Sequence, residues 1–222
     1  MNKTEQALAR LQRLFERGDL RPGSMVSESV LANMTGFGRT PIREAVQRLA
    51  LSHMIRIHPS RGIEIPPISV EDQLSGLEVR RALEVLCVTL ACQRATEAQL
   101  AEMKALASTL DGDFSLEGYG ETVRETHRMI IEAAHNPYLG AHMRPLQALS
   151  RRFWLVHVRD EKREIETGSA LHRRILEAIA DRDVEKAVAA SQGLNDYLIE
   201  FATEIITRRS GQGGLAAASP PA

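Results

Sequence analysis

The sequence has little of several features that define common protein classes. It has two cysteines among 222 residues, which excludes a disulfide scaffold and a zinc finger built from cysteines. Aromatic residues make up 4% of the chain, which argues against a single-strand nucleic-acid binder that works by base stacking. No apolar run approaches the roughly 18 residues of a membrane-spanning helix, and the charged N-terminus does not look like a signal peptide. We therefore expect a soluble, cytoplasmic protein without a membrane partner.

Charge is nearly balanced over the whole chain, but it is not evenly distributed along it. The formal net charge is −1, while residues 1–66 hold ten Lys and Arg against six Asp and Glu, or +4. The remainder holds 18 basic residues against 23 acidic ones, or −5. A basic first third on an acidic body predicts a polyanion-binding module joined to a second domain. Within the basic part, Arg10, Arg17 and Arg21 are expected to be solvated surface charge.

Glycine and proline divide residues 1–66 into short elements. Apolar residues recur at helical spacing over residues 3–17, and a second short helix is predicted over 28–34. The tight turn T-G-F-G then leads to a third helix, with Pro41 near its first turn. Alternating apolar residues over 55–65, interrupted by P-S-R-G, predict a two-stranded hairpin. Three helices followed by such a wing are the winged helix-turn-helix plan.

The N-terminal end of the third helix carries side chains suited to reading DNA. Arg39 and Arg43 are four residues apart and share one helix face, with Thr40 beside them. An arginine fork can bond to guanine O6 and N7 together, so these residues are predicted to meet bases in the major groove. Arg61, beside Gly62 at the wing tip, is predicted to reach the DNA backbone or the minor groove.

The stretch FERGDLRPGSMVSESVLANMTGFGRTPIREAVQRLALSHMIRIHPSRGIEI closely resembles the DNA-binding domain of the GntR family. The matching elements are G-x-L-x-P-G, S-E-x-x-L-A, G-x-x-R-T-P-x-R-E-A-x-x-R-L and the wing I-R-I-x-P-x-x-G, and together they cover residues 6–65. Two departures, Ser29 for a frequent arginine and Gly38 for the usual serine cap, bear on which operator sequence is read. The DNA contacts that the resemblance implies fall on Arg39, Thr40, Arg43, Arg61 and Gly62.

Beyond the proline pair at residues 66–67 the sequence pattern is helical, and Gly168 is its one ambiguous interruption. About six helices are predicted, over residues 70–95, 97–110, 118–135, 137–157, 160–181 and 183–208. The predicted class is mainly α: a winged helix-turn-helix domain over 1–66 and an antiparallel all-α bundle over 67–209. The low-complexity segment 210–222 is predicted to be a disordered tail.

The helical body resembles the FCD effector-binding domain of the FadR branch of GntR regulators, and its helix count resembles the shorter VanR-like subgroup. The matching segments are LEVRRALEVLCVTLAC, THRMIIEAAHNPYL and LHRRILEAIADRDVEKA. Many family members hold a divalent metal there with one aspartate and three histidines. Here His127 and His172 stand at two histidine positions, but Val123 and Leu194 stand at the other two ligand positions. We therefore expect no cofactor, since a divalent metal on the two histidines alone would need further donors.

Both histidines lie on apolar, inward-facing stripes of their predicted helices. They are either satisfied core histidines or parts of a polar pocket, where an imidazole can bond an effector carboxylate directly. Arg80 is either an anion anchor in this pocket or the partner of Glu84, one turn on, in a surface ion pair. Asn195 and Trp154 are weaker candidates for the pocket. The predicted effector-binding residues are Arg80, His127, His172 and Asn195.

These features predict a bacterial transcriptional regulator that binds double-stranded operator DNA as a homodimer. The resemblance implies a small organic, sugar or fatty acid-like effector and, most often, repression. The two histidines favour an effector that carries a carboxylate. A metal-dependent enzyme in the bundle is one alternative, but no nucleophile motif or P-loop supports it, so we expect no enzyme. The other alternative is an interaction module that no longer binds DNA, which Arg39 and Arg43 disfavour.

Overall fold

The computed structural model describes residues 2–216 and the side chains of residues 2–208. The chain divides into two compact units. The first unit comprises Met1–Ile68 and Pro145–Val156, and the second comprises Ser69–Arg144 and His157–Ala222. The division after residue 68 lies two residues beyond the predicted domain boundary. The assignment of the segment Pro145–Val156 to the first unit differs from the predicted organisation, in which it belongs to the helical body.

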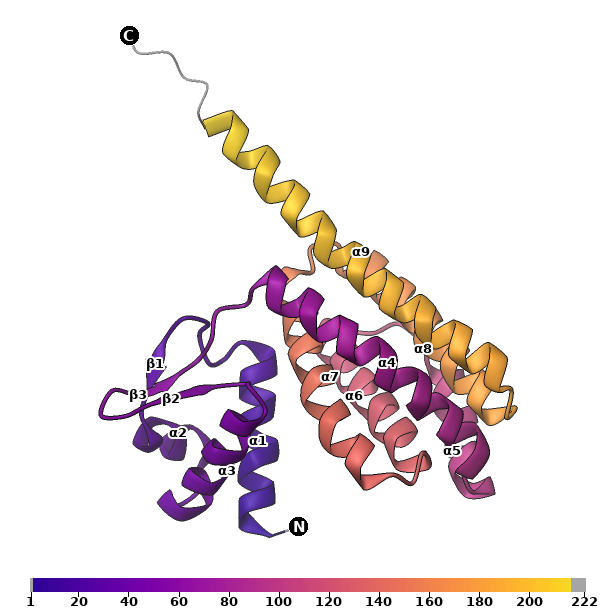
Figure 1. Cartoon of the computed structure of the whole chain (residues 1–222), viewed down its shortest axis with the longest axis horizontal. Helices are drawn as coiled ribbons and strands as arrows, with labels where there is room; N and C mark the ends of the chain where they lie inside the picture. Colours follow the sequence, from indigo (N-terminus) through magenta and orange to yellow (C-terminus); the bar gives the residue numbers. More distant parts are fainter. Residues whose placement is uncertain (1, 217–222) are drawn as a thin grey trace. The chain divides into compact units, whose positions relative to one another are not determined.

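The first unit contains a winged helix-turn-helix head. Its elements are α1 (Lys3–Arg17), β1 (Met25–Val26), α2 (Glu28–Thr35), α3 (Arg39–Leu51), β2 (Arg56–His58) and β3 (Gly62–Glu64), shown in Figure 1. The sheet is antiparallel in the order β1-β3-β2, and Ile63 of β3 lies between Val26 and Ile57. The predicted hairpin is confirmed, but β1 adds a third strand. That strand was missed because two residues are too few to show a period.

Local caps and one apolar core hold this head together. Asn2 and Glu5 form a capping box at the start of α1, and Ser27 caps α2 by accepting from the backbone N–H of Val30. Gly18 ends α1 in the left-handed conformation at φ 80°, where glycine is favoured. The core under these elements includes Leu11, Phe15, Leu31, Ile42, Val46, Leu49, Ile55 and Ile63.

The helices of the body are α4 (Val70–Arg94), α5 (Glu97–Thr109), α6 (Leu116–Ala133), α7 (Pro137–His157), α8 (Glu161–Ala180) and α9 (Val184–Ala216). Within the described residues this matches the predicted count of six, and α4 and α9 lie side by side (Figure 1). α9 runs past its predicted end at residue 208 and ends at Ala216. Of the predicted tail, residues 217–222 lie outside the described residues.

An ion pair connects α1 to the α7 segment of the first unit. Arg151 donates from Nε and Nη2 to the two carboxylate oxygens of Glu16, both at 3.1 Å. The pair is almost removed from water, because the side chains of Arg151 and Glu16 are 11% and 3% exposed. A bidentate ion pair with so little exposure to water fixes the position of the α7 segment against α1.

The neighbouring arginine reinforces this contact. The Arg152 guanidinium lies 3.9 Å from the ring centre of Phe15, and its Nη2 donates to the backbone oxygen of Pro66 at 3.1 Å. Burial lowers the pKa of Arg152 to about 10, so the group stays protonated at neutral pH. The α7 segment is thus attached to α1 and to the end of the wing by two adjacent arginines.

We expect Arg151→Gln to lower the free energy of unfolding of the first unit by about 3 kcal/mol, because the Glu16 carboxylate would remain buried without its guanidinium. Urea denaturation measures this loss. The control is Arg208→Gln, which breaks an exposed pair with Glu204 and should cost no more than about 0.5 kcal/mol. Equal losses in the two variants would show that the Glu16–Arg151 pair does not hold the segment in place.

Candidate functional site

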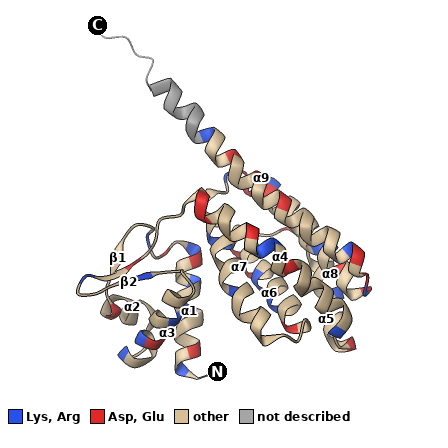
Figure 2. Cartoon of the chain, in the orientation of Figure 1, with Lys and Arg blue, Asp and Glu red and all other residues tan. Residues whose placement is uncertain are grey.

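The N-terminal end of α3 is exposed, and its opposite face is buried. Gly38 caps the helix in an extended conformation without a side-chain hydrogen bond, so α3 begins at Arg39. Arg39 and Thr40 are exposed in the first turn, whereas Ile42 and Val46 are buried in the head. Figure 2 shows charges of both signs on the head. A DNA-reading role therefore rests on the placement of Arg39 and Arg43 on α3 and not on a uniformly basic surface.

Glu28 at the start of α2 lies beside Arg43. Nε of Arg43 is 3.4 Å from both carboxylate oxygens, and the arginine side chain is still 71% exposed. Such an exposed pair adds little to stability. Within the described residues only Nε is engaged, so both Nη groups keep their N–H donors for another partner, such as a base edge.

The wing requires glycine at residue 62 for a structural reason. Gly62 has φ +108°, and a Cβ at this position would lie 2.9 Å from the backbone oxygen of Val26. Any larger residue would therefore push β3 away from β1. Arg61 is exposed at the turn, so the structure places both predicted wing residues at the tip of the hairpin.

Polar side chains also hold the wing strands β2 and β3 together. The Glu64 carboxylate accepts hydrogen bonds from Nε2 of His58 at 2.5 Å and from Nη1 of Arg56 at 3.3 Å. The hydrogen bond from His58, helped by the charge of Arg56, lowers the pKa of Glu64 below its usual value. Sequence analysis assigned His58 no role, because its partner lies on the other strand.

The second unit buries an ion pair on α4. Nε of Arg80 donates to Oε1 of Glu84 at 2.7 Å, and the two residues are 2% and 6% exposed. The fully buried Asn195 of α9 donates from Nδ2 to the other carboxylate oxygen of Glu84. Arg80 and Glu84 are therefore ion-paired as one alternative had it, but the pair is buried and not at the surface.

The two histidines continue this cluster. His127 Nε2 lies 3.4 Å from Nη2 of Arg80, and it acts as the acceptor because a guanidinium can only donate. The rings of His127 and His172 are 5.4 Å apart between centres. His172 Nδ1 donates to the backbone oxygen of Gly168 at 2.7 Å, and the Tyr119 hydroxyl lies 3.2 Å from the same nitrogen. Burial raises the pKa of Tyr119, so its hydroxyl stays protonated.

The absence of a side chain at Gly168 makes room for Tyr119. A Cβ on Gly168 would lie 2.1 Å from the Tyr119 hydroxyl oxygen, which is far inside contact distance. The glycine thus lies inside α8 and marks a close approach between helices, not a loop. A glycine inside a predicted helix was the sequence signal that could have revealed this close contact between Tyr119 and α8.

The structure brings the four predicted effector residues into one buried cluster linked through Glu84, Tyr119 and Gly168. Two polar atoms near it, Oδ1 of Asn195 and Oγ of Ser169, are buried and have no hydrogen-bond partner among the described residues. Trp154, a weaker candidate, lies in the α7 segment of the first unit. The predicted residues that the structure brings together are Arg80, His127, His172 and Asn195.

The cluster does not fit the metal centre that the family resemblance implies. Val123 and Leu194 are buried hydrophobic side chains and supply no ligand atoms. Nε2 of His127 already faces the Arg80 guanidinium, and cation repulsion opposes a metal beside it. Among the described residues, no group of three or more His, Cys, Asp or Glu is arranged to hold a metal ion.

Comparison with known families decides the identity of the chain. The family of bacterial regulatory proteins named gntR matches residues 3–65, and the FCD domain family matches residues 76–196. The chain belongs to the GntR family. The matched ranges coincide with the winged head and with most of the helical body of this GntR regulator, so the predicted fold class and family are both confirmed.

Relatives of this GntR regulator are themselves regulators of transcription. It is 27% identical over 201 residues to the Nta operon transcriptional regulator of Aminobacter aminovorans, covering 86% of this chain and 93% of that protein. It is 26% identical over 181 residues to the HTH-type transcriptional regulator YdhC of Bacillus subtilis (strain 168), covering 80% of each.

Solved structures share its fold. McbR/YncC of E. coli superposes with a TM-score of 0.75 at 20% identity, over 93% of this chain and 99% of that one. A putative GntR transcriptional regulator from Rhodococcus sp. RHA1 superposes with a TM-score of 0.66 at 22% identity, with the same coverage.

These findings establish the general function. The GntR regulator is a ligand-responsive, DNA-binding transcriptional regulator, as predicted. Its family and relatives point to transcriptional regulation and not to catalysis. No helix in the described part of the chain is both long and apolar enough to span a bilayer.

We expect Gly168→Ala to destabilise the second unit by about 1–3 kcal/mol, because the added methyl group must displace the Tyr119 hydroxyl. Tyr119→Phe removes the clashing oxygen, so the double variant should lose less stability than the sum of the two single variants. Urea denaturation of the four proteins measures this coupling. Strictly additive losses would contradict the contact.

Proposed function

We propose that this GntR regulator binds a pseudo-palindromic operator as a homodimer, with one winged head on each half-site. The observation that carries the proposal is the exposed N-terminal end of α3, where Arg39, Thr40 and Arg43 are free of the apolar core. A recognition helix meets base edges with this end. Arg61 and the backbone at Gly62 then contact the DNA backbone or minor groove from the wing.

Exposed apolar side chains on α4 support the homodimer. Val79 and Leu86 are 53% and 45% exposed, and they lie seven residues apart on one face of the helix. A second copy of the chain could cover this face and place the two heads on one operator. A regulator that binds in this way represses transcription when its operator overlaps a promoter, and we place its action in the cytoplasm.

The buried cluster of the second unit is the proposed effector site. The described contacts of Arg80 engage Nε and one Nη2 hydrogen, and a guanidinium has five N–H donors. The remaining donors suit a carboxylate, and the unpartnered oxygens of Asn195 and Ser169 suit a hydroxyl or amino group on the same ligand. The proposed effector is therefore a small carboxylate-type molecule, held by Arg80, His127, His172 and Asn195.

Selection of binding sites from a random duplex library tests the operator proposal directly. Recovery of one pseudo-palindrome, bound with two chains per site, would support it. Recovery of unrelated sequences at low salt would show that the head binds DNA without reading it. Recovery of no duplex at all would favour the interaction module that does not bind DNA.

Arg43→Ala should weaken binding to the selected operator by about 1–3 kcal/mol and relax the base preference at one position of each half-site. Its affinity for scrambled DNA should change much less, because the contact is to a base. Fluorescence anisotropy with both duplexes measures this difference. The control is Arg48→Ala, which removes an exposed arginine at the other end of α3. A loss that is equal on both duplexes would instead show that Arg43 contacts phosphate.

His172→Ala should raise the concentration of acid needed to release the operator by about tenfold, the effect of losing one hydrogen bond to a charged group. DNA affinity without acid should stay unchanged. A panel of short mono- and dicarboxylic acids, screened by operator release from the wild type, supplies the ligand for this measurement. His135→Ala is the control, because His135 is an exposed histidine outside the cluster. If no acid releases the wild type, the carboxylate assignment is wrong. If His172→Ala unfolds the second unit, the histidine is a core residue and not a ligand.

A further inference from the structure

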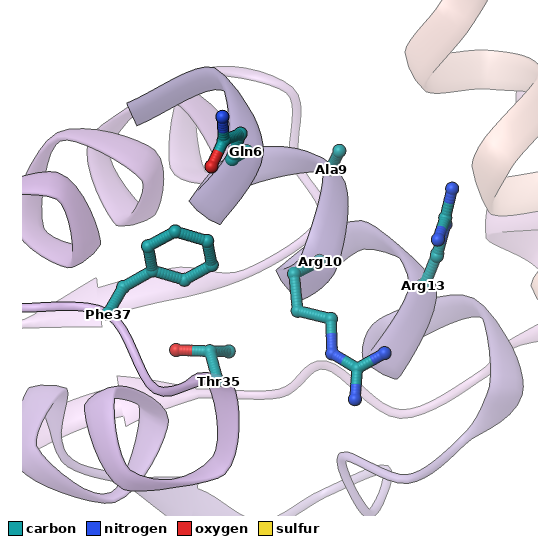
Figure 3. A pocket seen from close by; sticks show the side chains of 6 residues that line it. All are labelled: Gln6, Ala9, Arg10, Arg13, Thr35 and Phe37. Atoms are coloured by element: carbon teal, nitrogen blue, oxygen red, sulfur yellow. The ribbon is translucent and has the colours of Figure 1, made fainter. Parts of the chain in front are cut away.

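A pocket of about 280 Å³ opens on the surface of the first unit, between α1 and the turn that leads into α3. Figure 3 shows the ring of Phe37 on one side of this pocket and the side chains of Arg10 and Arg13 on the other. Phe37 comes only two residues before Arg39, the first residue of α3. The lining residues are Gln6, Ala9, Arg10, Arg13, Thr35 and Phe37.

The pocket carries positive charge that nothing in the described part of the chain neutralises. Arg10 and Arg13 are exposed, and none of the hydrogen bonds or ion pairs among the described residues involves their side chains. None of the lining residues is acidic. Arg43, Arg80 and Arg151 each pair with a carboxylate, whereas Arg10 and Arg13 line one pocket without such a partner. The expectation that Arg10 is only solvated surface charge does not explain why it shares a pocket with a second unpaired guanidinium.

The two arginines are not needed to fold α1. They lie on a different face from Ala7, Leu11 and Leu14, which are buried in the head. Like charges three residues apart on a helix repel each other, so an anion between them would relieve that repulsion. Arginine is well suited to phosphate oxygens, because its planar fork can donate two parallel hydrogen bonds.

We propose that Arg10 and Arg13 clamp one backbone phosphate of the operator, next to the bases that α3 reads, with Phe37 as an apolar wall for the adjoining sugar. The clamp rests on the proposed operator binding and extends it to a surface outside the helix-turn-helix and wing. The phosphodiester is favoured because the pocket belongs to the DNA-binding head and shares the turn that precedes α3. A phosphate contact fixes register without reading sequence.

The test is the salt dependence of DNA binding by the double variant Arg10→Gln, Arg13→Gln in the full chain. Loss of one phosphate contact should reduce the slope of log K against log salt concentration by about 0.9 in magnitude. The reduction should be the same for the selected operator and for a scrambled duplex of equal length. The control is Arg163→Gln, Arg174→Gln, which removes the same charge from exposed positions on α8 and should leave the slope unchanged.

Thermal unfolding of both double variants verifies that the head remains folded, as expected for exposed positions. A slope equal to that of the wild type would overturn the clamp while leaving operator binding intact. A loss confined to the operator duplex would also overturn it, because the contact would then be to a base. A wild type that binds neither duplex would refute the proposed function itself, and the clamp with it.

Discussion

The second unit depends on compensation of one buried charge. Arginine keeps its proton in proteins, so the guanidinium of Arg80, only 2% exposed, carries a full charge inside the bundle. Glu84 neutralises this charge from one turn away on the same helix, and Asn195 ties the carboxylate to α9. Removing one member would leave an uncompensated polar group in the core. Charge compensation therefore determines how α4 and α9 face each other, in addition to apolar packing.

The same ion pair bears on the positions where the family resemblance places four metal ligands. Only His127 and His172 are histidines there. His127 turns a ring nitrogen toward Arg80, while Val123 and Leu194 fill two positions where metal ligands are expected. A guanidinium of the protein itself thus lies beside the imidazole that the family resemblance assigns to a metal. For an effector to change DNA binding, it must bind one arrangement of the regulator more tightly than another. At the proposed effector site, the groups that would make this distinction are the guanidinium donors, the imidazoles and the unpartnered oxygen of Asn195.

Much of the fold could be predicted because its signals are local. Helical and alternating periods marked the head, and the inward stripes carrying His127 and His172 marked the cluster. The features that were missed depend on contacts across the chain. No local pattern shows that β1 will pair with β3 or that the Pro145–Val156 segment of α7 will join α1. The burial of the Arg80–Glu84 pair and the fit of Tyr119 against Gly168 likewise arise only when helices pack.

The central claim, that the Arg80 guanidinium beside His127 leaves the proposed effector cluster unfit for a metal ion, is tested most directly by thermal unfolding of the chelator-treated protein with zinc, nickel or manganese added back. A metal at about 100 times its dissociation constant would stabilise the fold by about 2.7 kcal/mol. The account predicts that none of the three ions changes the Tm of the second unit. A clear rise in Tm that disappears in His127→Ala and His172→Ala would show that the histidines hold a metal despite Arg80, and would contradict it.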